Sequence, residues 1–339
     1  MNWNDFKLSF LPKNAEQSKD RIAYLDFLKV LAAFLTVFYH FAYYKLDYGF
    51  DAMQGTYFPN FNRIVMCFAS CCVPIFFIVN GTLLLGKSRS WKSVYIKAIK
   101  ILVLTVVWSL AGFPSWFFKT LIILYLLFPL FQYLYMKKPI LYRIAILLIL
   151  VFPFGYNAVL LIIKMADANT AIHILGRTII VGNLSVTGFF TMYSILYFLL
   201  GPILANKRIP TGLGVASAAI GLGLVVFECV SYTVMNGTVY DGVNAAFPTY
   251  GAMLLSAGIF VAAKNTVVKG TRIISWLGNG ILPIYLMHMA LIHIIDKLFE
   301  FTSIILPIAI VGTTFILFAC VGVGRIASRV PVLCWFVRI

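Results

Sequence analysis

Three ionisable residues, Asp26, Lys29 and His40, lie within the first long apolar stretch of the sequence, DFLKVLAAFLTVFYH. Such side chains are rare inside membrane helices and usually mark a function or a buried partner. At about 100° per residue, Lys29 and His40 point within roughly 20° of each other, and Asp26 lies within about 40° of His40. The three side chains therefore share one stripe of a helix, which we expect to form one wall of an elongated cavity.

The chemistry open to this stripe is proton transfer at one end and charge stabilisation at the other. The unperturbed pKa of histidine, about 6.5, allows His40 to gain and lose a proton near neutral pH. Lys29 lies about 16 Å from His40 along the helix axis. Two alternatives stay open: Asp26 and Lys29 as a simple ion pair three residues apart, and His40 as a structural histidine in the outer interface.

Hydrophobic residues make up 62% of the 339-residue chain and charged residues only 11%, a composition typical of a polytopic all-α membrane protein. Apolar runs predict about ten transmembrane helices. They fall at 24–44, 63–85, 99–112, 116–136, 141–154, 188–204, 212–235, 247–263, 281–295 and 304–323. The third, fifth and ninth runs are short for a full crossing, and residues 154–165 either extend the fifth or re-enter the membrane.

The basic residues predict the orientation of these helices. With the N-terminus inside, twenty Lys and Arg residues fall on cytoplasmic flanks, six fall on outer flanks and Lys29 lies within the first run. This asymmetry places both termini in the cytoplasm, with a segment at 1–23, a transmembrane domain at 24–325 and a tail at 326–339. The first run has no cleavage signal and is expected to stay as a span. The net charge of +16 is then explained by an anionic leaflet of the plasma membrane, and no nucleic-acid partner is expected.

The second apolar run contains Asn80 and Gly81 near its cytoplasmic end. An amide can donate to a carbonyl oxygen of a substrate, and glycine allows close backbone approach. The alternative is a hydrogen bond between helices combined with small-residue packing. In the next segment, Lys97 and Lys100 either reach phosphates at the membrane surface or only satisfy the bias of cytoplasmic flanks towards positive charge.

Three more residues are candidates for lining a substrate path. Trp116 opens the fourth run, where an aromatic residue is commonly an interface anchor. Tyr285 and His288 lie three residues apart on one face of the ninth run, so that His288 could face the same cavity as His40 or serve in hydrogen-bonded packing. The six cysteines are scattered through apolar runs and indicate neither a metal site nor a disulfide framework.

The order and spacing of these residues resemble the integral-membrane acyltransferase 3 family, over nearly the whole chain. The matching positions are Arg21, Leu25, Asp26, Leu28 and His40; Pro74, Phe76, Phe77 and Gly81; Trp116, Phe117 and Leu124 to Leu127 with Pro129; Tyr197 to Gly201; and Tyr285, Leu286 and His288. The departures are Lys29 for arginine, Asn80 for serine, Pro114 for histidine, and Lys97 and Lys100 for arginines. Lysine keeps the charge but loses the planar fork of arginine.

The resemblance implies a membrane O-acyltransferase with a cytosolic acyl-CoA donor, most often acetyl-CoA, and a hydroxyl of an extracytoplasmic carbohydrate or lipid-linked glycan as acceptor, with no metal. His40 would be the general base or carry the acyl group itself. Asp26 would orient Lys29, and Lys29 would hold the donor or stabilise oxyanion charge. The remaining candidates for the path are Arg21, Asn80, Lys97, Lys100, Trp116, Tyr285 and His288. A glycan or small-acid transporter and a non-catalytic relative remain alternatives, and the sequence leaves the oligomeric state open.

Overall fold

The computed structural model is helical and describes most of the chain. The described residues are 22–51, 56–57, 59–86, 89–110, 116–166, 171–174, 177–180, 190–236, 238–240, 243, 247–267, 269 and 271–330. Arg21 lies outside them. The helices are α2 (Ala23–Ala42), α3 (Phe61–Phe68), α4 (Cys72–Leu85), α5 (Trp91–Leu110), α6 (Trp116–Leu126), α7 (Phe128–Lys137), α8 (Pro139–Ile149), α9 (Gly155–Ala166), α10 (Phe190–Asn206), α11 (Thr211–Asn236), α12 (Tyr250–Thr266), α13 (Arg272–Gly278), α14 (Ile281–Phe299) and α15 (Leu306–Ala327).

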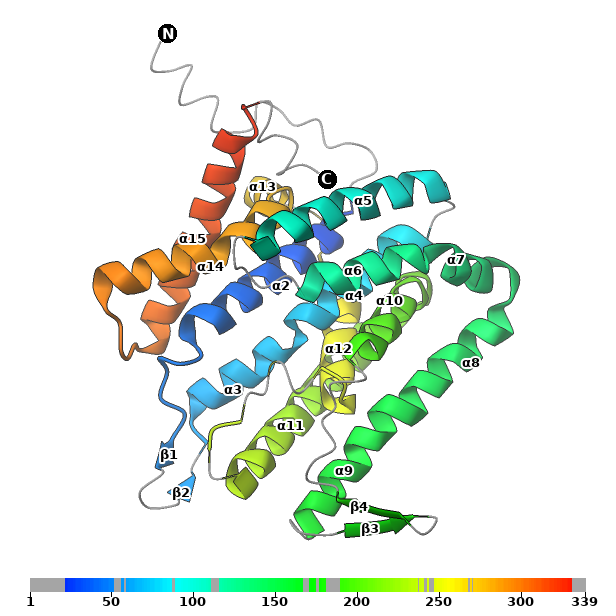
Figure 1. Ribbon diagram of the computed structural model, residues 1–339, viewed down its shortest axis with the longest axis horizontal. Helices are drawn as coiled ribbons and strands as arrows, with labels where there is room; N and C mark the ends of the chain where they lie inside the picture. Colours follow the sequence, from blue (N-terminus) through cyan, green and yellow to red (C-terminus); the bar gives the residue numbers. More distant parts are fainter. Residues whose placement is uncertain are drawn as a thin grey trace.

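Two short antiparallel ribbons accompany the helices: β1 (Phe50–Asp51) with β2 (Thr56–Tyr57), and β3 (Ala171–Ile174) with β4 (Arg177–Ile180). In the second ribbon Ala171 pairs with Ile180 and Ile174 with Arg177. The ribbons lie at the periphery of the helical bundle (Figure 1). The helices therefore build most of the core.

Within the described residues, seven helical stretches are long and apolar enough to cross a membrane, which makes the chain a multi-pass membrane protein. An eighth is added if α6 and α7, which meet at a 50° bend, form one span. Pro129 near the start of α7 accounts for the bend, because proline cannot continue the hydrogen bonds of α6. The all-helical membrane class is as expected, whereas the count of ten and the orientation of the termini stay predictions.

All three apolar runs that are short in the sequence belong to longer helices, and the ninth is α14, which ends at Phe299 rather than at Ile295. The third begins at Trp91 rather than Ile99, so that its lysines lie on the helix itself. The fifth continues from α8 through a π-helical turn (Leu150–Phe154) into α9, and the apolar stretch reaches Ile163. The helices extend into their flanks because a membrane segment must satisfy its backbone groups internally, and a helix does so without a partner.

The centre of the bundle is α4, whose residues are buried on nearly every face. A helix that is apolar all round belongs in a core. Helix α2 packs against α4, α13, α14 and α15, and Figure 1 shows it running through the middle of the molecule. By contrast, α5, α8 and α11 expose many large apolar side chains, which suits contact with lipid. The three ionisable residues of α2 are therefore carried by a central helix.

Helices α11 and α12 cross very closely. A Cβ built on Gly221 would lie 2.2 Å from the backbone nitrogen of Leu255, and one on Gly258 would lie 2.4 Å from that of Ala218. Small residues allow membrane helices to approach in this way, where van der Waals packing replaces the hydrophobic effect as the driving force. This closely packed pair lies beside α4, which contacts α12.

Candidate functional site

The ionisable residues of α2 face different surroundings. Asp26 is buried, and its Oδ1 lies 3.2 Å from the Nζ of Lys29. Its carboxylate faces α13, because a Cβ built on Gly278 would lie 3.4 Å from the same oxygen. This arrangement fits the ion pair three residues apart. The expectation that the three side chains form one wall of a single cavity is wrong. Asp26 lines neither of the two cavities described below, Lys29 lines one of them and His40 lines the other.

Lys29 faces a cavity of about 480 Å³, which we call the inner cavity because it lies towards the predicted cytoplasmic half of α2. Its polar lining comes from Lys29, Asn80, Tyr125, Asn279 and Tyr285, and its apolar lining includes Leu83. A volume of this size is within the range of pockets that hold organic ligands. Among the described residues, the cavity therefore offers one cation, two amides and two phenols to a ligand with an apolar stem.

Asn80 lines the inner cavity and also links two helices. Its Nδ2 donates to the carbonyl oxygen of Phe76 at 2.8 Å, and the Tyr125 hydroxyl donates to its Oδ1 at 3.4 Å. The helix-to-helix hydrogen bond is thus present, between α4 and α6. One amide hydrogen of Asn80 is left for a ligand, since an amide has two and only one is used here.

His40 lies on a second, smaller cavity of about 60 Å³, the outer cavity, together with Thr36, Trp108, Trp116 and His288. The rings of His40 and His288 are 5.3 Å apart between centroids. Helix α2 supplies the first histidine and α14 the second. The structure thus brings together the two histidines that the sequence placed in different apolar runs.

The protonation of the His288 ring follows from its partners. Its Nδ1 lies 3.0 Å from the carbonyl oxygen of Ile284 and 2.8 Å from that of Tyr285. Carbonyl oxygens only accept, so Nδ1 carries the hydrogen and donates it. In the neutral ring Nε2 is then an acceptor, and it is buried with no hydrogen-bond partner among the described residues. His288 therefore presents a free acceptor nitrogen at the outer cavity.

Four aromatic residues, Phe76, Phe117, Phe118 and Tyr285, line both cavities. We call them the aromatic partition. The ring of Tyr285 lies 4.8 Å from that of Phe117 and 4.6 Å from that of Phe118, and Phe76 lies 5.8 Å from Phe117. These distances are typical of packed aromatic pairs. The partition separates the lysine end of the site from the histidine end.

The basic residues at the start of α5 lie outside both cavities. Lys97 and Lys100 line neither, although Lys97 interacts electrostatically with Lys100 and with Arg89. Arg89 is nearer to the site, because its Nε donates to the carbonyl oxygen of Leu83 at 2.9 Å. Arg89 was not singled out in the sequence, where it looked like one of several flanking cations.

Trp116 lines the outer cavity, with its ring 6.2 Å from that of Phe117 and 6.4 Å from that of Phe247. It is 37% exposed, so it combines a cavity wall with a position at the edge of the protein. Phe118 and Trp108 were missed in the sequence. No signal there distinguishes them from other aromatic residues of apolar helices, because only packing brings them to the cavities.

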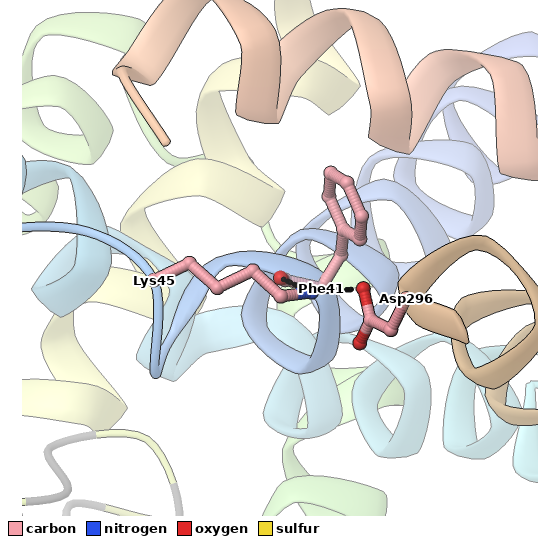
Figure 2. Close-up of polar contacts among 3 residues, drawn as sticks. All are labelled: Phe41, Lys45 and Asp296. Carbon is pink, nitrogen blue, oxygen red and sulfur yellow. Dashed lines mark hydrogen bonds and ion pairs between the residues drawn. The ribbon is translucent and has the colours of Figure 1, made fainter. Parts of the chain in front are cut away.

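An ion pair ties together the two helices that carry the histidines. The Nζ of Lys45, five residues beyond His40, lies 2.6 Å from Asp296 Oδ1 on α14 and 2.9 Å from the carbonyl oxygen of Phe41 (Figure 2). The same ammonium lies 4.3 Å from the centre of the Phe41 ring. Only 10% of the Lys45 side chain is exposed. A cation at the C-terminal end of α2 also interacts favourably with the helix dipole.

The fold and site define a class: a multi-pass helical membrane protein with two adjoining internal cavities, one holding a lysine and the other a pair of histidines. The model of the acyltransferase domain of the acyltransferase 3 family matches residues 22–115 and 107–325, and the chain belongs to this family of membrane acyltransferases. No curated protein and no solved structure matches the chain. The matched ranges include every described residue that lines the two cavities.

Proposed function

We propose that the protein is a plasma-membrane O-acyltransferase that moves an acyl group, most simply acetyl, from cytosolic acyl-CoA to a hydroxyl of an extracytoplasmic carbohydrate or lipid-linked glycan. The observation that carries the proposal is the pair of adjoining cavities, with Lys29 on one and His40 on the other. With both termini cytoplasmic, the inner cavity is reached from the donor side and the outer cavity from the acceptor side. Such a site joins two substrates that never share a compartment.

In this proposal the donor enters the inner cavity with its phosphates towards the cytoplasm. Arg89, Lys97, Lys100 and, by its position in the motif, Arg21 supply positive charge on that side. Lys29 and the free amide hydrogen of Asn80 hold polar groups of the pantetheine arm. The thioester then lies at the aromatic partition, next to Tyr285 and within reach of the outer cavity.

The reaction takes place at the histidine end. The acceptor hydroxyl loses its proton to His40, its oxygen forms a bond to the acyl carbon, and the bond from that carbon to sulfur breaks. The leaving thiolate takes up the proton, so that the free thiol returns towards the cytoplasm. His288 Nε2 is available to accept a hydrogen bond from the hydroxyl or from His40, which would orient the attacking group.

The proposal is tested with membranes that contain the protein and acetyl-CoA radiolabelled in the acetyl group. We expect label to appear on carbohydrate, to depend on the protein and to be released by mild base, as an ester is. Accumulation of an unmodified glycan or small acid across the membrane, with no label on it, would instead identify a transporter. Equal labelling with wild type and with His40→Ala would contradict the proposed site.

Lys29 is expected to contribute to donor binding. Lys29→Ala should weaken acyl-CoA binding about tenfold, because among the described residues Lys29 is the one cation that lines the inner cavity, and because its loss removes the ion pair with buried Asp26. Lys29→Arg should keep the affinity or raise it, since a guanidinium adds a planar fork of donors. Displacement of labelled acyl-CoA from the purified protein measures both. Equal affinity of wild type and Lys29→Ala would remove Lys29 from the donor site.

The ion pair of Lys45 and Asp296 is expected to affect turnover without contacting either substrate. Lys45→Met keeps most of the stem but loses the link between α2 and α14, and turnover should fall roughly fivefold, equivalent to about 1 kcal/mol. Lys45→Arg should restore it, since it retains the charge. Lys297→Met, at an exposed lysine next to Asp296, is the matched control and should leave turnover unchanged. A loss with Lys45→Met that Lys45→Arg does not restore would argue against the ion pair.

A further inference from the structure

The two cavities differ greatly in size on either side of the aromatic partition. The inner cavity measures about 480 Å³ and the outer about 60 Å³. A water-sized group needs about 10–15 Å³ on this measure, so the outer cavity holds about four to six such groups. An acetyl group has three non-hydrogen atoms and fits beside a hydroxyl, whereas a six-carbon acyl chain fills or exceeds this space.

The walls of the outer cavity offer little room for expansion. Phe117 and Phe118 are buried, and both rings pack on Tyr285 at under 5 Å. On the far side, Phe247 is buried and Trp116 packs against it. Buried aromatic rings in packed pairs resist displacement, because protein interiors are close-packed and each ring makes many contacts.

The partition also determines what can pass from one cavity to the other. Lys29 and Asn80 line only the inner cavity, and His40 and His288 line only the outer. A thioester held from the inner side must place its carbonyl carbon past Phe118 and Tyr285 to meet a hydroxyl beside His40. The part of the donor beyond that carbon, which is the acyl chain, then has to lie in the outer cavity.

We propose that the aromatic partition selects the acyl group by size, with Phe118 and Tyr285 as the specificity-determining residues. The inference rests on the proposed acyl transfer and adds the residues that restrict the donor to a short acyl chain of two or three carbons. The chain length is limited because the acyl carbon exchanges sulfur for oxygen within the small outer cavity that these rings border. Phe118 belongs to α6 and Tyr285 to α14, so the limit is set where two helices meet.

The test compares acyl donors of different length on the same protein. Membranes with wild type, Phe118→Ala or Phe128→Ala are supplied with acetyl-CoA or hexanoyl-CoA, each labelled in the acyl group, and label on carbohydrate is measured. Phe128 is fully buried and lines neither cavity, which makes it the matched control. Wild type should prefer acetyl. Phe118→Ala should raise the ratio of hexanoyl to acetyl transfer about tenfold or more, which is the lower end of the discrimination that hydrophobic pockets achieve between substrates of different size. Phe128→Ala should lower the amount of folded protein and leave the ratio unchanged.

Several outcomes would overturn the inference. Wild type that transfers hexanoyl as readily as acetyl would exclude a size limit, and a folded Phe118→Ala with an unchanged ratio would exclude Phe118 as its cause. If Phe118→Ala does not fold, Phe118→Leu is used, with a smaller rise expected and the same contradiction if none occurs. Absence of transfer from any donor by wild type would contradict the acyltransferase proposal itself, which separates the two failures.

Discussion

Replacement of His40 by alanine is expected to lower acyl transfer at least a hundredfold while the protein remains inserted, folded and able to bind acyl-CoA. His40 lines the outer cavity, 5.3 Å from the ring of His288, and Lys29 is assigned to the other cavity. A general base contributes typically 10²- to 10⁴-fold, so a measurable residual rate should remain if His40 only accepts a proton. An obligatory acyl carrier would leave no residual transfer, because the covalent intermediate could not form. Transfer of labelled acetyl, followed over a range of protein concentrations, measures the residual rate.

Two further variants are needed to interpret the result with His40→Ala. His293→Ala changes an exposed histidine on α14 and should leave transfer unchanged, which controls for losing any histidine from this helix. His288→Ala removes the free acceptor nitrogen and should cause a smaller loss than His40→Ala if His288 orients the attacking group. Wild-type turnover in His40→Ala would contradict the assigned base. If acyl transfer were lost in His288→Ala but not in His40→Ala, His288 would be the general base, because its Nε2 is free to accept a proton.

Residues whose role depends on one helix were predictable from the sequence. The ion pair of Asp26 and Lys29 follows from their spacing of three, and it is present at 3.2 Å. That His288 faces the same cavity as His40 was a hypothesis, because it required two separate apolar runs to be neighbours in space. The order of the family motifs supports this neighbourhood but gives no distance between the two rings. The helical membrane class follows from composition alone, because few other structures satisfy the backbone within lipid.

Residues whose role depends on packing were not predictable. The stripe on α2 is continuous by helical periodicity, but aromatic rings from α4, α6 and α14 divide the space in front of it. Lys45 and Asp296 are 251 positions apart, and in the sequence Lys45 is only a cation on the outer side. Periodicity gives the direction of a side chain on its own helix, whereas these contacts depend on which helices are adjacent and how they are rotated.

The second large effect is expected at the crossing of α4 and α10, where two glycines of the family-like motifs meet. A Cβ built on Gly81 would lie 1.8 Å from the carbonyl oxygen of Phe198, and one on Gly201 would lie 2.3 Å from that of Ile78. The obstructing atoms belong to backbone, so no side-chain rotation relieves the overlap. The structure thus assigns Gly81 the close-packing role that was one of its two interpretations, and it explains why a glycine ends each motif.

We therefore expect Gly201→Ala to reduce the yield of monodisperse protein severely and to lower its thermal stability, since overpacking costs typically 1–3 kcal/mol and this overlap is with backbone. Gly223→Ala is the control, because a Cβ there meets nothing within 4 Å. In a helix alanine is otherwise more favourable than glycine by about 1 kcal/mol, so the control should be unchanged or slightly stabilised. Size-exclusion chromatography after heating steps measures both variants. Because the same crossing holds α4, which carries Phe76 and Asn80 to the cavities, any Gly201→Ala protein that survives should also bind acyl-CoA more weakly. A Gly201→Ala variant as stable as Gly223→Ala would show that the two helices do not cross at this distance.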